Sequence, residues 1–197
     1  MATIRPVKPE EVEHCIELGV NAFETIPASD LTREKLMGGL KPNGKDWRFR
    51  RGEAFRAEFA RGPDEGCNLA AELDGKVVGF VQAEASSITG EGLVHYIAVE
   101  GGHQGAGLGR LLLEAGVDWL KDQGMTVAKI DSLASNDTGL YLYPAFGFTE
   151  VNREVHLAMR LDGGPPLGTA GGRRHQAAGG YEPGFAWGAR VATCKPP

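Results

Sequence analysis

The alternation of hydrophobic and polar positions divides the chain into short strands and amphipathic helices. The run over residues 93–99 is rich in β-branched and aromatic side chains, which is typical of a strand buried on both faces. A glycine-rich turn follows over 101–109, and apolar residues then recur at helical spacing from Leu108 to Leu120. This order predicts a central strand that leads through a glycine loop directly into a helix.

The same patterns predict further elements on both sides of this unit. Helical patterns open at Pro9, run from about residue 30 to Met37, and recur with moderate periodicity over 47–61. Strands are expected at 3–7, 68–73, 76–84, 126–133, 150–153 and 154–161, with Asp74-Gly75 as a two-residue hairpin turn. The strand–helix–strand unit over 93–133 should be a parallel crossover. We therefore expect an α/β (α+β) fold, a mixed sheet with helices on both faces.

Composition separates a folded domain from a tail. The chain has 197 residues, enough for one domain with a substantial core. We place this domain at 1–161, because residues 162–197 are rich in Gly and Pro and show no periodicity. The tail also carries Tyr181, Phe185 and Trp187, so it is expected to be either flexible or docked.

Charge and cysteine content narrow the class of partner. The formal net charge is −5 and no basic patch is present, which argues against nucleic acid as a partner. No apolar run approaches the length of a membrane span, and the first residues do not resemble a signal peptide. The three cysteines are far apart, with neither metal-ligand spacing nor an obvious disulfide pairing. These features predict a cytoplasmic protein with no metal site and no membrane partner.

The glycine-rich turn predicts an anion-binding site. The first amides of a helix lack internal partners and carry partial positive charge, and glycines let a phosphate approach them closely. A nucleotide P-loop is excluded, because Gly107 is followed by Leu108 and Gly109 without Lys, Ser or Thr. The dinucleotide fingerprint is also excluded, because its third glycine would come one residue later. The alternative at this point is a surface turn that binds nothing.

Two motifs resemble one family. Gln104-x-x-Gly107-x-Gly109 is similar to the [RQ]-x-x-G-x-[GA] signature of the GNAT superfamily of acyl-CoA N-acyltransferases. The block from Asn136 to Phe148 is similar to the family's N-x-x-A-x-x-L-Y-x-x-x-G-F, with Gly139 where Ala is usual. The resemblance covers about residues 3–161. It implies the GNAT fold, a mixed sheet of about six to seven strands flanked by helices, with a V-shaped split between the fourth and fifth strands.

The resemblance also implies acetyl-CoA as cosubstrate. In the family the signature loop wraps the pyrophosphate, and the main chain of the fourth strand pairs with the pantetheine arm and supplies an oxyanion donor near Val99. Asn136 would help to hold the pantetheine or the loop, and Gln104 replaces a commoner Arg. The cofactor-binding residues implied are Ile97, Ala98, Val99, Gln104, Gly105, Ala106, Gly107, Leu108, Gly109, Arg110, Asn136 and Tyr143.

Acyl transfer to an amine needs a base for the ammonium, an acid for the thiolate and an oxyanion donor. Tyr143 stands where the family has the phenol that protonates the thiolate. His95 matches a catalytic histidine of family members that acetylate arylalkylamines, and imidazole titrates near neutral pH. Alternatively, His95 is a buried structural histidine, and Glu84, Glu91 or water acts as the base. Phe23, Ile26 and Glu84 are candidates for contact with the acceptor.

The resemblance implies an N-acetyltransferase that transfers an acetyl group from acetyl-CoA to a primary amine of a small molecule by direct attack in a ternary complex. A protein or peptide N-acetyltransferase is an alternative, although the insertion at 41–66 argues against an open groove. A non-catalytic acyl-CoA-binding module is a second alternative. We expect a monomer or a homodimer.

Overall fold

The computed structural model describes residues 2–25, 29–154, 156 and 158–163. Within them a five-stranded sheet has the order β1-β2-β3-β4-β5. The strands are β1 (Thr3–Pro6), β2 (Gly66–Leu73), β3 (Lys76–Ser86), β4 (Glu91–Val99) and β5 (Val127–Ile130). The first four pair antiparallel and β5 pairs parallel with β4. The predicted mixed α/β architecture and parallel crossover are confirmed.

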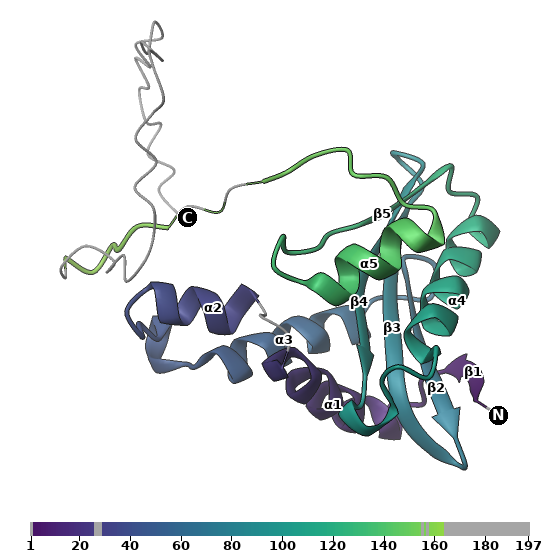
Figure 1. The fold of residues 1–197 in the computed structure, drawn as a ribbon, viewed down its shortest axis with the longest axis horizontal. Coiled ribbons are helices and arrows are strands. Elements are labelled where there is room, and N and C mark those ends of the chain that lie inside the picture. Colours follow the sequence, from purple (N-terminus) through teal and green to yellow (C-terminus); the bar gives the residue numbers. More distant parts are fainter. Residues whose placement is uncertain (1, 26–28, 155, 157, 164–197) are drawn as a thin grey trace, which may run out of the picture.

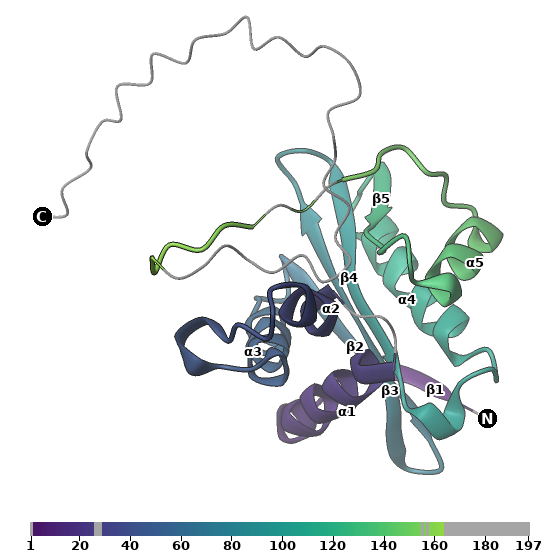
Figure 2. The same ribbon diagram turned by 60° about the vertical axis from the view of Figure 1, so that its left-hand side comes forward.

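Helices cover both faces of the sheet (Figures 1 and 2). The helices α1 (Val12–Thr25) and α3 (Trp47–Phe59) lie on one face, with α2 (Ser29–Leu36) against α3. The helices α4 (Leu108–Asp122) and α5 (Asp137–Phe146) lie on the other. Short 3-10 helices occupy Pro9–Glu11, Pro42–Gly44 and Gly101–His103. In the described part of the chain, no helix is long and apolar enough to cross a membrane.

The two layers of helices enclose two cores separated by the sheet. On the first face, Cys15 of α1 and Phe55 of α3 are buried with Phe80 of β3. On the second face, Leu112 and Leu113 of α4 are buried among side chains of β3 and β4. The strand β3 is therefore buried on both sides, as a central strand with a nearly continuous apolar sequence should be.

Residues with positive φ explain the turn between β2 and β3 and the end of α4. The hairpin between β2 and β3 uses Asp74 and Gly75, both with positive φ (50° and 78°), the conformation that a two-residue turn of the primed type needs. Gly124 follows α4 with φ of 76° and ends that helix. The Asp74-Gly75 turn and the end of this helix at Gly124 were both predicted from the sequence.

The end of the chain differs from expectation. The strands predicted at 150–153 and 154–161 are not present among the described residues there, so the sheet formed by the described residues has five strands and not the six to seven expected. Val151, Met159 and Leu161 are exposed. Their apolar spacing suggested strands, yet they pack on no sheet face. Residues 164–197, most of the expected tail, lie outside the described chain.

The pairing of β4 changes along its length. It pairs with β5 only over its first part, with Val94 opposite Ile130 as the last partners. From His95 to Val99 it continues beside β3 without β5. This separation lies where the resemblance places the split between the fourth and fifth strands.

Candidate functional site

A β-bulge in β4 directs His95. Gln82 of β3 pairs with Tyr96 and the next residue, Ala83, pairs with Val94, so His95 is the extra residue. A bulge of this kind sends two successive side chains to the same face and is a common way to re-aim one of them. Accordingly Tyr96 joins the core beneath α1 and α3, and His95 faces Glu58 at the end of α3.

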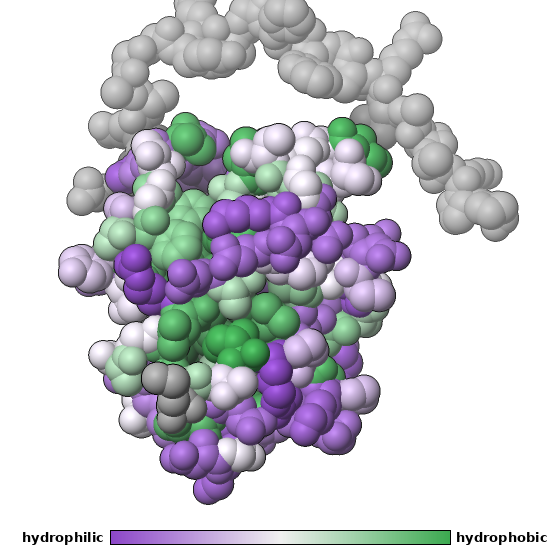
Figure 3. Space-filling view, turned by 90° about the vertical axis from the view of Figure 1, so that its right-hand side faces the viewer, coloured by the Kyte–Doolittle hydropathy of each residue, from purple (hydrophilic) through white to green (hydrophobic). Residues whose placement is uncertain are grey.

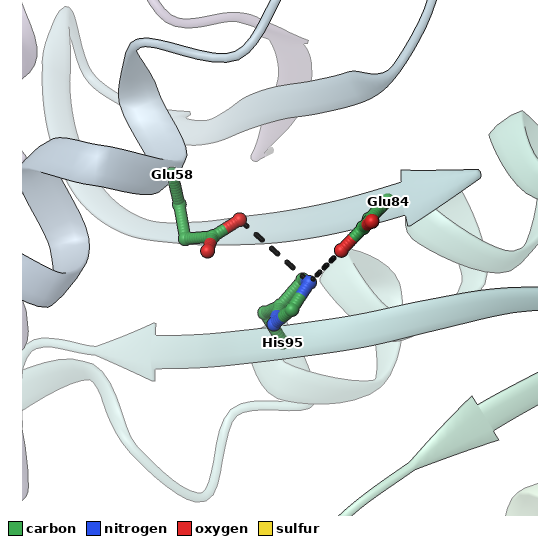
Figure 4. Close-up of side chains that lie close together, drawn as sticks. All are labelled: Glu58, Glu84 and His95. Carbon is green, nitrogen blue, oxygen red and sulfur yellow. Dashed lines mark hydrogen bonds and ion pairs between the residues drawn. The ribbon is translucent and has the colours of Figure 1, made fainter. Parts of the chain in front are cut away.

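His95 lies among two carboxylates and a guanidinium (Figure 4). Its Nε2 atom is 2.7 Å from Oε2 of Glu84 on β3 and 3.7 Å from Oε2 of Glu58. Arg61, just after α3, bonds Glu58 through Nε (2.5 Å) and approaches Oε2 of Glu84 (3.2 Å). The four side chains are partly buried, between 13% and 33% exposed. We call Glu58, Arg61, Glu84 and His95 the acid–base cluster.

The charges of the acid–base cluster do not cancel. Two carboxylates face one guanidinium, so one negative charge is uncompensated while His95 is neutral. Hydrogen bonding to Glu58, followed by the nearby carboxylate charges, raises the pKa of Arg61, so it remains a cation.

The donor atoms of Glu58, Glu84 and His95 lie within 4.8 Å of one another, near enough for a metal ion. Such an ion would have to displace Arg61 from both carboxylates.

Below His95 the polar contacts continue into β2. The side chain of Gln82 is 1% exposed, and its amide nitrogen donates to Oδ1 of Asn68 at 2.8 Å. Its Oε1 is buried and has no hydrogen-bond partner in the described structure. Gln82 lies two residues from Glu84 on β3, so the floor beside the acid–base cluster is polar.

Aromatic rings form the next part of this face. Phe23 of α1, predicted to contact the acceptor, packs edge-on against Phe55 (5.6 Å) and Tyr96 (6.0 Å). The guanidinium of Arg51 lies 5.0 to 5.7 Å from these three rings. Phe23 is thus a packing residue of an aromatic wall next to His95. Ile26 lies outside the described residues.

The glycine loop has an open backbone. Gly105 and Gly107 have positive φ (79° and 83°), and a Cβ placed on either would meet nothing within 4 Å. Gly107 is the N-cap of α4 without a side-chain cap, so the first amides of the helix face outward. The loop therefore fits an anion. The side chain of Gln104 donates to the Val99 carbonyl at 3.0 Å, which ties the loop to the end of β4.

The surface that carries α4 and α5 is partly apolar. Leu111, in the first turn of α4, is 42% exposed, and Leu140 and Tyr141 of α5 are exposed too. Figure 3 shows apolar residues gathered between hydrophilic ones on this side. Arg110 follows the loop, and its guanidinium lies 5.5 Å from the ring of Phe146.

Tyr143 is held by α5, a helix that sequence reasoning did not predict. Asn136 caps it, accepting from the Gly139 amide (3.1 Å) and donating to Ser132 Oγ (3.2 Å). This capping role occupies the side chain that was expected to help hold the pantetheine or the loop. Tyr143 is half-buried against Phe148 (6.3 Å) in the α4-side core. Burial raises the pKa of its phenol, which keeps the proton at neutral pH.

The structure divides the predicted site residues between the two faces of β4. His95 and Glu84 meet on the α3 side, whereas the glycine loop and Tyr143 belong to the α4 side. Glu91, the other carboxylate considered as base, pairs with Lys129 at 2.8 Å instead. Glu58 and Arg61 were missed, because no spacing in the sequence links the end of α3 to β4.

Comparisons with known proteins agree with this architecture. The acetyltransferase (GNAT) family profile matches residues 33–148, more than half of the chain. A mycothiol acetyltransferase from Tsukamurella paurometabola is 36% identical over 88 residues, which are 44% of this chain and 30% of the relative. The chain thus matches about a third of the length of such curated relatives.

Solved structures share the fold at low identity. The PaiA N-acetyltransferase of Thermoplasma acidophilum, in complex with coenzyme A, has a TM-score of 0.63 at 17% identity, covering 78% of this chain and 93% of that chain. An aminoglycoside N-acetyltransferase in complex with coenzyme A has a TM-score of 0.55 at 18% identity, covering 81% and 95%. These likenesses concern the fold alone. The family profile, which matches more than half of the chain, leads to one conclusion: the chain belongs to the acetyltransferase (GNAT) family.

Proposed function

We propose that the chain transfers an acetyl group from acetyl-CoA to the primary amine of a small molecule, with His95 as the base and Tyr143 as the acid. The observation that carries the proposal is the contact between His95 and Glu84 at the bulge of β4, where β4 parts from β5. A histidine beside a carboxylate is a common arrangement for a general base.

The reaction requires three proton transfers. An alkylammonium has a pKa near 10, so the acceptor gives a proton to His95 before its nitrogen attacks the thioester carbonyl. The carbon–sulfur bond then breaks, the phenol of Tyr143 protonates the departing thiolate, and the second proton of the amide nitrogen passes to the Tyr143 phenolate, which restores the phenol. Because burial raises its pKa, Tyr143 would enter the cycle protonated.

Direct attack in a ternary complex is supported by the state of the thiols. Cys15 and Cys67 are buried, and burial raises the pKa of each, to about 12 and about 11. Neither is a thiolate at neutral pH, so neither suits the role of a nucleophile that would carry the acetyl group. Cys194 lies outside the described residues.

For acetyl-CoA, we infer that the open backbone from Gln104 to Gly109 binds the pyrophosphate at the N-terminus of α4. Arg110 adds a positive charge next to it. The β4 main chain at Ile97, Ala98 and Val99 would take the pantetheine arm where β5 no longer pairs. In the present structure the Val99 carbonyl accepts from Gln104, so that bond would rearrange on binding.

For the acceptor, the uncompensated negative charge of the acid–base cluster favours a cationic amine. The names of the mycothiol and aminoglycoside acetyltransferases described above point to small-molecule acceptors. We therefore place the acceptor amine on the α3 side of β4, next to His95 and the aromatic wall.

Calorimetry with acetyl-CoA tests the cofactor site. We expect the wild type to bind and Gly107→Glu to lose binding, because Glu would bring negative charge and a strained positive φ to the loop. Gly124→Glu is the matched control: it has the same charge change and a similar φ (76°), at the other end of α4. Equal binding by wild type and Gly107→Glu would refute the site.

A thiol-release assay tests turnover. The panel consists of 2-phenylethylamine, spermidine, glucosamine, kanamycin and a peptide with a free N-terminus. We expect release with at least one small amine, and a loss on the order of 10²-fold in kcat in Tyr143→Phe with acetyl-CoA binding retained. Release with the peptide alone would favour a protein acetyltransferase, and binding without release would favour an acyl-CoA-binding module.

A further inference from the structure

The bond between His95 and Glu84 determines which ring nitrogen can take a proton. An ionised carboxylate only accepts hydrogen bonds, so Nε2, 2.7 Å from Glu84 Oε2, must carry a hydrogen. A neutral imidazole has one N–H, and its other nitrogen is then the acceptor. In Figure 4 that second nitrogen lies on the side of the ring away from both carboxylates. The geometry leaves Nδ1 as the basic atom.

Arg61 keeps this arrangement in place. It contacts Glu58 at 2.5 Å and 3.1 Å and Glu84 at 3.2 Å, so a single guanidinium braces both carboxylates that face Nε2. It also offsets one of their two charges. Without that offset, the carboxylates would favour an imidazolium that is already protonated and cannot act as a base.

We propose that Glu84 and Arg61 are positioning residues, which hold His95 with its proton on Nε2 and leave Nδ1 to take the proton of the acceptor amine. The role of Nδ1 in turnover rests on the proposed function, whereas the position and protonation of the ring do not. When Nδ1 accepts the proton, the imidazolium keeps its Nε2 bond to Glu84, and the acid–base cluster becomes neutral.

The charged and aromatic groups around the His95 ring come from α3, β3 and β4. Glu58 and Arg61 face it from the end of α3, Glu84 faces it from β3, and the ring of Tyr96 lies 6.0 Å away on β4. Glu65 acts on Arg61 through its charge. Replacing Glu84 and Arg61 changes the charge near the ring in opposite directions, so the two variants should move its protonation in opposite directions.

NMR on the free protein tests the positioning directly. Histidine labelled with ¹⁵N, with His95→Gln for assignment, gives the ring tautomer and the midpoint pH of protonation. We expect a hydrogen-bonded Nε2–H in the wild type, a midpoint lower by about one pH unit in Glu84→Gln, and a midpoint higher by a similar amount in Arg61→Met. Glu53→Gln, an exposed carboxylate of α3 paired with Arg56, should leave the midpoint unchanged. A neutral ring protonated on Nδ1, or midpoints that move together or not at all, would overturn the proposal.

The pH profile of kcat/KM with the best amine of the panel tests the role of Nδ1. We expect its acid limb to move to lower pH in Glu84→Gln and to higher pH in Arg61→Met, as the NMR midpoints do. Partial unfolding of a variant would lower its activity without moving this limb in opposite directions in the two variants. An acid limb that stays fixed while the NMR midpoints move would rule out Nδ1 as the base. If no amine is turned over, the proposed function fails, and the NMR result still decides whether Glu84 and Arg61 position the ring.

Discussion

At the residue scale, the space around Gly139 governs how Tyr143 is held. A Cβ placed on Gly139 would lie 2.7 Å from Asn136 Nδ2, 2.8 Å from Ser132 Oγ and 2.8 Å from Cε2 of Tyr143. The similar family motif has Ala at this position. In this chain Ser132, Asn136 and the tyrosine ring have closed around the missing methyl group, so glycine is required by packing and not by a special φ.

We therefore predict that Gly139→Ala lowers both stability and kcat. Alanine ordinarily gains up to about 1 kcal/mol over glycine inside a helix, but overpacking costs about 1–3 kcal/mol. The methyl group must push aside either the cap of α5 or the ring of Tyr143. Urea denaturation and kcat for the best amine check this prediction. A higher unfolding midpoint with unchanged kcat would show that a methyl group fits at position 139 without moving its neighbours.

Residue-scale chemistry was only partly predictable from the sequence. His95 and Tyr143 were identifiable as candidates because their residue types suit acid–base work and their neighbours resemble family motifs, and Glu84 was identifiable as an alternative base because it is a carboxylate near the end of a strand. Glu58 and Arg61 were not, because they reach His95 through packing of α3 on the sheet. The bulge that turns His95 toward them depends on the register with β3, which a single strand sequence does not specify.

At the element scale, α1 is packed closely enough for one methyl group to matter. A Cβ on Gly19 would lie 2.7 Å and 2.9 Å from ring atoms of Phe55 and 2.9 Å from Phe80. Gly52 of α3 lies in the same region, but its Cβ would meet Ile16 at an ordinary 3.6 Å. The two glycines thus form a matched pair in neighbouring helices.

We predict opposite effects from alanine at these two positions. Gly19→Ala should destabilise the fold by about 1–3 kcal/mol, because two aromatic rings must move. Gly52→Ala should stabilise it by about 0.5–1 kcal/mol, because helix propensity improves without a clash. Urea unfolding measures both changes. Equal effects of the two substitutions would mean that α1 does not approach the rings as described.

The elements themselves differed in how well the sequence predicted them. The Asp74-Gly75 turn and α4 were clear, because a turn that needs positive φ and a strong 3.6-residue period leave few alternatives. The helix α5 was missed, since Gly139 and Pro144 within it weaken the local signal. The alternation over 150–161 predicted strands that the described residues do not form, because alternation alone does not supply a partner strand.

At the scale of the whole molecule, Arg5 ties three separate parts of the chain together. It lies on the edge strand β1, bonds Glu72 of β2 at 2.7 Å, and bonds both oxygens of Glu11 at 2.7 Å. Glu11 ends the 3-10 helix that leads into α1. The hydrogen bonds from Arg5 lower the pKa of Glu11 from 4.5 to about 2. This four-residue edge strand and the entry to α1 thus depend on one ion-pair network.

This network should make stability depend on pH. The pKa of Glu11 is depressed in the folded state, so its contribution is complete above about pH 4.5 and is lost as the pH falls toward 2. The full shift corresponds to roughly 3 kcal/mol, but the carboxylate is 19% exposed, so we expect about 1–2 kcal/mol. Arg5→Met should be less stable than the wild type by this amount at pH 7, with a smaller difference at pH 3. Urea titrations at both pH values check it, with Lys121→Met, in an exposed pair, as control. A difference that stays constant from pH 7 to 3 would show that Arg5 acts through packing and not through Glu11.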